Sequence, residues 1–333
     1  MNTKKEMNTG NNANKMKASK PGPVREIHAE DVWARMPFRK EDSHKGTYGK
    51  LLMVAGSLRY RGAAALCAEG ALRSGCGIVT LASTEPVFLS TQPRLPEAIC
   101  LPCRADSAGG IAAGNFDQLS AELANGYTAL LMGPGMGNTG STRQLVTGLV
   151  ESASCPVLLD ADALNACAPD PLQKSGAAGE SADGPAAPDF RLPHPSGAPL
   201  VITPHPGEMA RLTGLSIAEV KARREELALA FAQQQDCIVI LKEHRTLIAV
   251  PDGSLWRNTT GGSGLARGGS GDILAGMIGA FLAQGRDPAD ASLCSVWLHG
   301  AAADRCAAAR SLTGMLPHDI FHALQQLFLE NSR

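Results

Sequence analysis

The chain has 333 residues, of which 44% are hydrophobic, so it can bury a large core as one big α/β domain or as two small ones. Its 31 lysines and arginines nearly balance 32 aspartates and glutamates, and the net charge of −1 argues against a general nucleic-acid-binding surface. The longest apolar runs are too short to cross a bilayer, which argues against a membrane protein.

The first residues form a polar, basic segment. Residues 1–23 hold five lysines before Pro21, together with Asn, Thr and Gly, and they lack an apolar stretch. Such a composition is not that of a secretory signal. We predict a disordered basic tail over residues 1–24.

The nine cysteines are scattered along the chain, and their odd number fits reduced thiols and a cytoplasmic location. Cys100 and Cys103 form a lone CxxC. A metal site needs two more ligands at matching spacing, and a thioredoxin-type site needs a helix start at the motif. Neither context is evident, so we interpret the two as incidental thiols.

Strands and helices are predicted to alternate along the first half of the chain. Strands are predicted at residues 51–55, 78–82, 129–132 and 157–159, and helices at 31–35, 62–74 and 139–151. The strands are continuous apolar runs. Such runs are typical of a parallel sheet covered by helices on both faces.

Residues 168–199 interrupt this alternation. They are rich in Pro, Ala, Gly, Ser and Asp and show no period, so we predict a flexible surface insertion without a role in the chemistry. The alternation then resumes, with strands predicted at 200–203, 237–241 and 247–250. Helices are predicted at 208–212, 217–234, 288–309 and 317–329, and a further helix follows a glycine-rich loop and ends at 284. The strand at 247–250 is a hairpin partner closing at Pro251-Asp252-Gly253.

The predicted elements indicate one α/β domain over residues 25–330. It has about eight strands in a mostly parallel sheet, with helices on both faces. Ligands of such sheets bind beyond the carboxyl ends of the strands. The segments that follow strands here are Gly56-Ser57, GPGMG (133–137), Asp160 with Asp162, and TPHPGE (203–208). Their convergence predicts a site at this edge.

Each of these segments also has a structural alternative. GPGMG can be a tight turn alone, and Glu208 can cap the helix that follows it. A lone histidine is more often structural, but His205 lies between two prolines that hold the backbone extended and rigid at a strand end, which makes it a candidate ligand contact. Lys242 and Arg245 follow another strand and offer cations for phosphates, or they line a solvated loop.

The segment GGSGLARGGSGDILAGMIGAFLAQG (261–285) places a glycine-rich loop before an apolar helix, with one acid, Asp272, at the junction. Glycine lets a backbone approach a ligand closely, and the free N–H groups of a helix start form an anion site. Asp272 can cap the helix or act as a base, and the density of glycine favours the base. A Walker loop and an early GxGxxG fingerprint are both absent, so any nucleotide is expected at this late loop.

Together the motifs resemble those of the ADP-dependent (S)-NAD(P)H-hydrate dehydratases, a branch of the ribokinase-like fold. The matching segments are HKGTYGK (44–50), GAAALCAEGALRSG (62–75), GPGMG (133–137), LDADALN (159–165), ITPHPGEMARL (202–212) and GLARGGSGDILAGMIGAFLAQG (264–285). Their order and spacing run from about residue 30 to 328. The GGSGD part alone is shared by many ribokinase-like kinases.

The resemblance implies a hydro-lyase that repairs nicotinamide cofactors. Its substrate would be the S epimer of hydrated NADH or NADPH (NADHX or NADPHX). ADP would phosphorylate the ring hydroxyl, phosphate would then leave, and the products would be NAD(P)H, AMP and phosphate. Mg²⁺ would bridge the phosphates.

The resemblance also implies roles for individual residues. Asp272 would be the catalytic base, and N–H groups of the glycine turn would hold the developing charge. The implied substrate contacts are Ala63, Gly135, Gly137, His205 and Asp272. The implied nucleotide contacts are Lys242, Glu243, His244, Arg245, Thr246, Gly268, Gly269, Ser270 and Gly271.

The chain departs from the family pattern after Lys242, where Glu243 replaces the usual glycine. Glutamate removes backbone freedom and adds negative charge near phosphates, which Arg245 would offset. The residues therefore leave the choice between ADP and ATP open.

Two other functions fit the same residues. A small-molecule kinase of the same fold, of the hydroxymethylpyrimidine or hydroxyethylthiazole type, would release a phosphorylated product, although PHPGE with LDADALN favours the dehydratase. A non-catalytic nucleotide sensor would keep only the pocket. By resemblance we also expect a homo-oligomer, a tetramer, and a functional partnership with an NAD(P)H-hydrate epimerase, whose domain does not fit into the first fifty residues.

Overall fold

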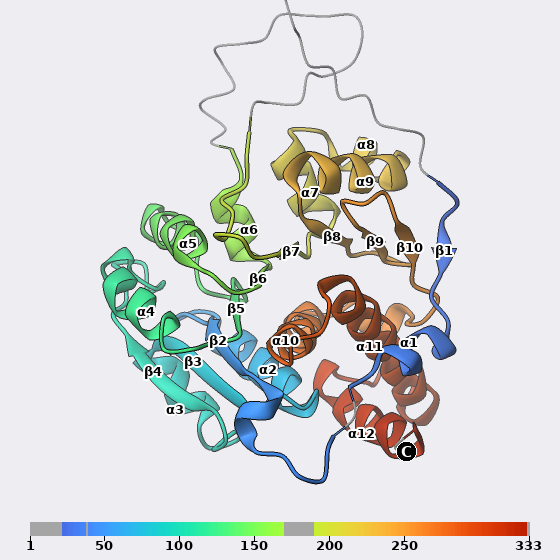
Figure 1. The fold of residues 1–333 in the computed structure, drawn as a ribbon, viewed down its shortest axis with the longest axis horizontal. Coiled ribbons are helices and arrows are strands. Elements are labelled where there is room, and N and C mark those ends of the chain that lie inside the picture. Colours follow the sequence, from blue (N-terminus) through green and yellow to red (C-terminus); the bar gives the residue numbers. More distant parts are fainter. Residues whose placement is uncertain (1–21, 38, 170–189, 332–333) are drawn as a thin grey trace, which may run out of the picture.

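The computed structural model describes residues 22–37, 39–169 and 190–331, and one sheet runs through this part of the chain (Figure 1). Its strands are β1 Arg25–Glu26, β2 Lys50–Val54, β3 Ile78–Thr84, β4 Ile99–Cys103, β5 Ala129–Met132, β6 Val157–Leu159, β7 Leu200–Ile202, β8 Ile238–Leu241, β9 Leu247–Ala249 and β10 Leu255–Arg257. In space they follow the order β1, β10, β9, β8, β7, β6, β5, β2, β3, β4. Neighbours are parallel from β8 to β4, whereas β9 is antiparallel to β8 and β10.

The central strands are buried on both faces. In β2, Leu51 and Met53 belong to the core on one side of the sheet, and Leu52 and Val54 belong to the core on the other side. Because successive side chains of a strand point to opposite faces, a strand covered on both sides must be apolar throughout. This explains the continuous apolar runs of the sequence.

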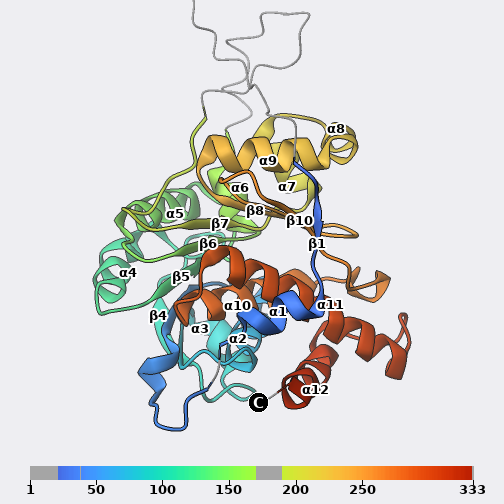
Figure 2. The ribbon, with the colours of Figure 1, turned by 45° about the vertical axis from the view of Figure 1, so that its right-hand side comes forward.

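Helices cover both faces of the sheet, and the views in Figures 1 and 2 agree on this layering. One core contains residues of α1 Ala29–Arg35, α2 Arg61–Arg73, α3 Glu85–Thr91, α10 Ser270–Ala283, α11 Pro288–Arg310 and α12 Ile320–Asn331. The other contains residues of α4 Phe116–Leu123, α5 Gly140–Ser152, α6 Asp162–Cys167, α7 Pro206–Thr213, α8 Ile217–Ala222 and α9 Arg224–Gln235. The predicted α/β fold with a mostly parallel sheet is confirmed.

Helix α10 is the central helix of its face. All its residues from Ile273 to Ala283 are buried, and glycines let it lie directly against α2. A Cβ on Gly276 would lie 2.0 Å from the carbonyl oxygen of Cys67, and a Cβ on Gly70 would lie 2.6 Å from that of Ile273. The start of α10, which carries Asp272, is therefore held in place by close helix packing.

Three strands were not predicted from the sequence: β1, β4 and β10. Strand β4 contains Pro102, and a proline inside an apolar run argues against a strand in the middle of a sheet. Among the strands that the structure describes, β4 lies at the edge and pairs only with β3, and a missing N–H donor is tolerated at an edge.

The predicted helix at residues 217–234 is in fact two helices. The break falls at Arg223, whose φ of −123° and ψ of 32° are not helical. Neither glycine nor proline marks this position, so the apolar pattern runs across the break. The turn at Pro251-Asp252-Gly253 joins β9 to β10, while β8 and β9 form the expected antiparallel pair.

The predicted tail and most of the predicted insertion lie outside the described residues. The described end of the insertion packs against α9. Leu192 is buried, and its N–H donates to Oε1 of Gln235 at 2.9 Å. The side-chain amide of Gln235 in turn donates to the carbonyl of Phe190 at 2.9 Å. Residues 190–192 are thus anchored to the domain.

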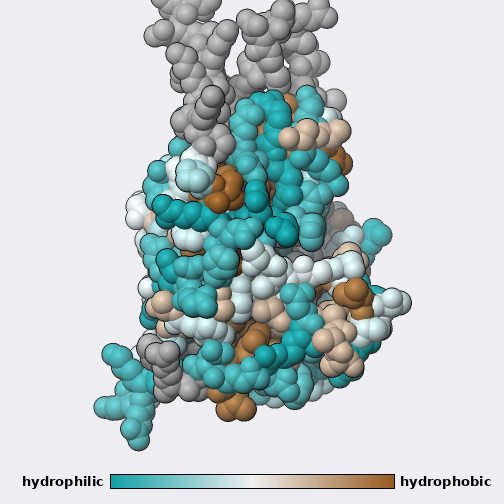
Figure 3. Space-filling view, turned by 90° about the vertical axis from the view of Figure 1, so that its right-hand side faces the viewer, coloured by the Kyte–Doolittle hydropathy of each residue, from teal (hydrophilic) through white to brown (hydrophobic). Residues whose placement is uncertain are grey.

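Within the described residues, no helix combines the length and the apolar character that crossing a bilayer requires. On the face shown in Figure 3, hydrophobic side chains lie in separate spots among hydrophilic ones. Single exposed hydrophobic residues of this kind are normal for a protein surface.

Candidate active site

Loops after several parallel strands meet at one edge of the sheet. The register pairs Val54 of β2 with Met132 of β5, Met132 with Leu159 of β6, and Leu159 with Ile202 of β7. These strands therefore end level with one another. The residues that follow them, and β8, include Gly56, Gly133, Asp160, Thr203 and Lys242. The convergence predicted from the sequence is present.

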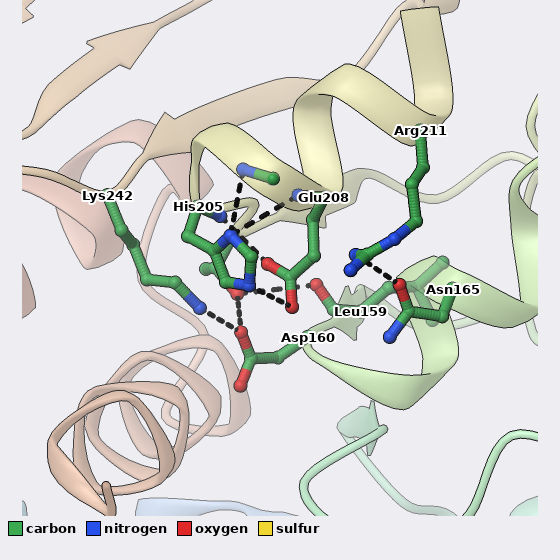
Figure 4. A network of polar contacts seen from close by, with 9 residues as sticks. Leu159, Asp160, Asn165, His205, Glu208, Arg211 and Lys242 are labelled. Atoms are coloured by element: carbon green, nitrogen blue, oxygen red, sulfur yellow. Dashed lines mark hydrogen bonds and ion pairs between the residues drawn. The ribbon is translucent and has the colours of Figure 1, made fainter. Parts of the chain in front are cut away.

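A network of polar contacts ties the loops after β6, β7 and β8 together (Figure 4). The carboxylate of Asp160, which is 1% exposed, accepts a hydrogen bond from Oγ1 of Thr203 at 2.6 Å and pairs with the ammonium group of Lys242. Burial by itself would lower the pKa of Lys242, but Asp160 and Glu208 outweigh it and raise that pKa. Lys242 is thus a cation whose charge is matched inside the protein.

His205 and Glu208 form the N-terminal cap of α7. The carboxylate of Glu208 accepts the main-chain N–H of His205 at 2.8 Å, and Nδ1 of His205 accepts the N–H groups of Gly207 at 2.9 Å and Glu208 at 3.3 Å. The capping alternative for Glu208 is therefore correct. Burial lowers the pKa of His205, with Lys242 and Arg211 adding to the effect. The ring is neutral at pH 7 and half-exposed, so a face of it is accessible to a ligand.

The GPGMG turn after β5 brings two of the implied substrate contacts together. Gly135 has a φ of +61°, and a Cβ on it would lie 2.9 Å from that of Ala63 and 2.6 Å from that of Tyr60. Gly137, with a φ of +95°, donates its N–H to the carboxylate of Asp162 at 2.9 Å. Packing and backbone conformation account for these glycines, which is the tight-turn alternative. Substrate contacts at Ala63, Gly135 and Gly137 stay a prediction.

The glycine turn, residues 268–271, forms the start of α10. Gly269 is the N-cap with a φ of +100°, a left-handed conformation that residues with a Cβ rarely adopt. Gly268 is exposed, with open space where a side chain would be. A Cβ on Gly271 would lie 3.6 Å from Nζ of Lys242. The free N–H groups of a helix start and an ammonium group are therefore neighbours, a combination that attracts an anion.

Ser270 differs from the glycines beside it. Its side chain is buried, and its Oγ has no hydrogen-bond partner in the part of the chain that the structure describes. The hydroxyl therefore points into the protein. The resemblance implies a nucleotide contact at Ser270. In this conformation only the main chain of Ser270 can make that contact.

Asp272 lies in the first turn of α10, and that helix has no side-chain capping hydrogen bond. The capping alternative is therefore wrong. Among the described residues, no hydrogen bond or salt bridge engages its carboxylate. Burial and, to a smaller extent, the nearby Asp160 raise the pKa of Asp272 to about 6, against the opposing effect of Lys242. An uncommitted carboxyl group with a pKa close to the working pH is suited to accept a proton.

The implied nucleotide-binding segment after β8 carries the glutamate that departs from the family pattern. Glu243 forms salt bridges with Lys221 at 2.8 Å and with Arg224 at 3.4 Å. Arg245 instead lies 3.6 Å from Glu26. The expectation that Arg245 offsets the charge of Glu243 is therefore wrong, because Lys221 and Arg224 provide the compensation.

Helix α9 also holds the backbone of this segment. The guanidinium of Arg224 donates to the carbonyl oxygens of His244 at 3.2 Å and Arg245 at 3.1 Å. Oγ1 of Thr246 donates to the carbonyl of Glu243 at 3.1 Å. The side chains of His244 and Arg245 are exposed. The segment is therefore fixed at its backbone and open at its surface.

The nine cysteines all lie within the described residues. All nine are free thiols, and Cys100 and Cys103 lie on the edge strand β4 rather than at a helix start. Among the residues that the structure covers, no three His, Cys, Asp or Glu side chains form a group that could hold a metal ion.

Asp160 is the residue of this site whose role the sequence did not show. Its position after a buried strand predicts that it lies near the site but gives it no function. The structure makes it the partner of Lys242 and one cause of the raised pKa of Asp272. The available signal was its position, since an acid directly after a buried parallel strand lies at the ligand-binding edge.

Comparisons with known proteins agree with this geometry. The model of the NAD(P)H-hydrate dehydratase family matches residues 51–326. The chain is 36% identical over 299 residues to the ADP-dependent (S)-NAD(P)H-hydrate dehydratase of Bacillus subtilis, covering 90% of this chain and 96% of that protein. It is also 36% identical over 295 residues to the bifunctional NAD(P)H-hydrate repair enzyme of Moorella thermoacetica, covering 88% of this chain and 52% of that enzyme. The chain thus spans about half the length of this bifunctional relative.

Solved structures extend the likeness to three dimensions. The Bacillus subtilis ADP/ATP-dependent NAD(P)H-hydrate dehydratase, co-crystallised with ATP/Mg²⁺, matches with a TM-score of 0.75 at 34% identity, over 92% of this chain and 99% of that chain. A ribokinase-like superfamily protein of Enterococcus faecalis matches with a TM-score of 0.74 at 24% identity, over 93% of this chain and 96% of that chain, which shows the fold alone. The predicted ribokinase-like fold is confirmed.

Proposed function

The chain belongs to the NAD(P)H-hydrate dehydratase family, and we propose that it catalyses the ADP-dependent dehydration of the S epimer of NADHX or NADPHX to NADH or NADPH. One observation carries the proposal. The uncommitted carboxylate of Asp272, with a pKa of about 6, lies at the glycine-rich start of a buried helix, in the field of the Lys242 ammonium. Transfer of a phosphoryl group to a hydroxyl requires a base and an anion site at the same place.

In the first step the ring hydroxyl of the substrate attacks the terminal phosphorus of ADP. A new P–O bond forms, the P–O bond to AMP breaks, and Asp272 accepts the hydroxyl proton. The N–H groups of the glycine turn, together with Lys242, stabilise the charge on the transferred group. This assigns the nucleotide phosphates to Gly268, Gly269, Ser270 and Gly271 through their main chain.

In the second step phosphate leaves the ring. The lone pair of the ring nitrogen expels it with the C–O bonding electrons, and the neighbouring ring carbon then loses a proton. The carbon–carbon double bond returns, and NAD(P)H, AMP and phosphate are the products. Little further catalysis is needed, because the substrate itself supplies the electrons.

We assign the hydrated ring to the side of the site formed by Ala63, Gly135, Gly137 and His205. The close packing of Gly135 against Ala63 supports this, since it brings two of these residues together at the strand ends. The neutral ring of His205 offers a hydrogen bond without adding charge.

We assign the adenylate to the segment from Lys242 to Thr246. Its backbone is fixed by Arg224, and the charge of Glu243 is already compensated. That charge is therefore no obstacle to ADP.

We propose that Mg²⁺ enters with the nucleotide. The described residues offer no group of three metal ligands, and Mg²⁺ is commonly held by one or two carboxylates plus substrate phosphates. The donor set among the described residues therefore fits an ion held mainly by the nucleotide phosphates and not a protein cage. When bound, Mg²⁺ neutralises phosphate charge.

The wider setting follows the family. We propose a homo-oligomer, a tetramer by resemblance, a cytoplasmic location, and cooperation with an NAD(P)H-hydrate epimerase. The name of the bifunctional Moorella thermoacetica relative, about half of which this chain spans, supports a link between dehydratase and a second repair activity.

The test is incubation with chemically hydrated NADH, ADP and Mg²⁺, while the near-ultraviolet absorbance of reduced nicotinamide is followed. We expect the absorbance to return and AMP and phosphate to form in equal amounts. A phosphorylated product that persists would indicate a kinase. Tight ADP binding without turnover of any candidate would indicate a sensor, and either outcome would overturn the proposal.

A further inference from the structure

The residues assigned so far leave one charged part of the substrate without a cation. NADHX and NADPHX carry a diphosphate between their two riboses, and it is separate from the phosphates of ADP. The glycine turn and Lys242 are assigned to the phosphates of ADP, and Lys242 is already paired with Asp160. The ring side of the site adds no positive charge, since His205 is neutral. A phosphate group is best bound by a cation that donates hydrogen bonds, so a further cation is expected beside the ring side.

Arg211 on α7 lies at this place. It follows His205 by six residues and is therefore about 9 Å further along the helix. Figure 4 shows both side chains extending from α7 towards the side where Asp160 and Asn165 lie. The charge of Arg211 acts at the ring side, because it adds to the effects of burial and Lys242 that lower the pKa of His205. The ribose between ring and diphosphate, together with the long arginine side chain, can span the distance along α7.

A neutral group holds the guanidinium of Arg211 in place. Its Nη1 donates to Oδ1 of Asn165 at 2.8 Å, and it forms no salt bridge with any residue that the structure describes. By contrast, Arg305 donates to both carboxylate oxygens of Glu330 at 2.7 and 2.8 Å. An amide fixes the guanidinium without matching its charge. The Arg211 side chain is exposed, and most of its N–H groups remain for the oxygens of a phosphate.

Asn165 connects Arg211 with the GPGMG turn. Asn165 lies on α6, and Asp162, the first residue of that helix, accepts the N–H of Gly137 at 2.9 Å. One short helix therefore links Arg211 to the turn that we assign to the hydrated ring. The link also gives a role to the ends of two segments, LDADALN and ITPHPGEMARL, that the proposed reaction leaves without one.

We propose that Arg211, positioned by Asn165, binds the diphosphate of the dinucleotide substrate. This inference rests on the proposed dehydratase function, because it takes NADHX or NADPHX as the substrate. Arg211 is then a substrate-binding residue and Asn165 a positioning residue. Neither takes part in the transfer of the proton or of the phosphoryl group.

The first test is steady-state kinetics of Arg211→Gln, which removes the charge and keeps a polar side chain. Hydrogen bonds to a charged group are strong, so we expect the KM for hydrated NADH to rise about 10- to 100-fold. We expect kcat and the KM for ADP to change less than about threefold, because the lost contact is the same in the ground state and the transition state.

Arg39→Gln is the matched control. Nη2 of Arg39 also donates to a neutral group, the carbonyl of Gly75, at 2.8 Å, and Arg39 is exposed without a salt bridge to any described residue. Gly75 precedes β3, so this contact lies at the opposite edge of the sheet. We expect both KM values of this variant to equal those of wild type. An unchanged KM for hydrated NADH in Arg211→Gln, or an equal rise in Arg39→Gln, would overturn the proposal.

Asn165→Asp separates substrate binding from a purely structural contact. A carboxylate at this position pairs with Arg211 and repels a diphosphate. We therefore expect the KM for hydrated NADH to rise about as much as in Arg211→Gln. A contact that served only the fold would be kept as a salt bridge, and the KM would not change. A wild-type KM in folded Asn165→Asp would contradict the inference.

A substrate without phosphate tests the contact itself. The hydrated form of reduced nicotinamide riboside keeps the ring hydroxyl and one ribose but has no diphosphate. We expect kcat/KM for this riboside to be equal in wild type and Arg211→Gln, because the lost contact is absent in both cases. The same relative loss on the riboside as on hydrated NADH would show that Arg211 acts through the fold, which would overturn the proposal.

A further readout does not depend on turnover. NADH carries the same diphosphate, and its fluorescence reports its binding to the protein. We expect the Kd for NADH to rise about 10- to 100-fold in Arg211→Gln and Asn165→Asp and to stay unchanged in Arg39→Gln.

The two measurements also separate the two proposals. If wild type binds NADH through Arg211 but does not convert hydrated NADH, the dehydratase function fails and the diphosphate site stands. If hydrated NADH is converted while Arg211→Gln changes neither its KM nor the Kd for NADH, the diphosphate site alone fails. A wild-type protein that neither binds NADH nor converts hydrated NADH would contradict both.

Discussion

Two regions at the same edge of the sheet handle their charges in opposite ways. In the loops after β6, β7 and β8, Asp160 is paired with Lys242 and Thr203, and Glu208 caps α7. At the glycine turn, by contrast, the carboxylate of Asp272 is uncommitted. The first region keeps its shape through its own contacts. The second leaves polar groups free, which costs stability and makes them available to a ligand.

The two aspartates illustrate the contrast most clearly. Asp160 is buried and its charge is matched by Lys242. Asp272 lies in the electric field of Asp160 and Lys242, and its pKa is raised to about 6, mainly by burial. One carboxylate is therefore structural and the other is prepared to exchange a proton.

The largest effect is expected from Asp272→Asn, which should lower turnover. Removal of a general base lowers kcat by about 10²- to 10⁴-fold, while ADP binding should stay nearly intact because the N–H groups of the turn remain. Steady-state kinetics and calorimetric titration with ADP check this. Asp236→Asn at the end of α9 is the control, since Asn tolerates its left-handed φ of +48°. Unchanged turnover in Asp272→Asn would mean that another group is the base.

The second-largest effect is expected from Lys242→Met, which should lower the stability of the folded protein. This change leaves Asp160 buried without its cation, and we expect the free energy of unfolding to fall by about 3–5 kcal/mol. The double variant Asp160→Asn/Lys242→Met should recover a large part of that loss. Urea unfolding measures all three. A single variant as stable as wild type would show that the first region does not depend on its internal ion pair.

A smaller effect of opposite sign is expected for the stability of Asp272→Asn. The pKa of Asp272 in the folded protein is about 6, above its ordinary value of 3.8, so ionisation of Asp272 destabilises the folded state. This penalty is absent below the ordinary pKa, grows as the pH rises and is complete above about pH 6. Asp272→Asn removes it, so we expect a gain of about 1–2 kcal/mol at neutral pH and almost none near pH 4. Urea unfolding at the two pH values tests the sign, and a loss of stability at neutral pH would contradict it.

The smallest effect is expected from Glu243→Gln. Because Lys221 and Arg224 already compensate Glu243, the KM for ADP should change less than about threefold and stability less than about 1 kcal/mol. A tenfold lower KM for ADP would show instead that this charge opposes the phosphates.

The same contrast separates what the sequence predicts from what it does not. The sheet was predictable because runs such as Leu51–Val54 must be apolar when both faces are covered. The glycine turn and Asp272 were predictable because adjacent residues form them. Strand β4 was missed because Pro102 argues against a strand, and the break at Arg223 has no local marker.

Long-range pairing was not predictable. Lys242 lies 82 positions from Asp160 in the sequence, and only the fold makes them partners. The same holds for Ser270, which the resemblance places among nucleotide contacts although its hydroxyl faces inward. A motif indicates that a residue is near a ligand, but the packing behind the motif decides which atoms face it.

The most direct test of this account is the pH dependence of kcat/KM for hydrated NADH, measured at saturating ADP and Mg²⁺ in wild type and in His205→Asn. Because Asp272 must be ionised to accept the hydroxyl proton, we expect the rate to fall about tenfold per pH unit below pH 6 in both proteins. A decline that begins only near the ordinary carboxyl pKa, or one that disappears in His205→Asn, would contradict the assignment of Asp272 as the base.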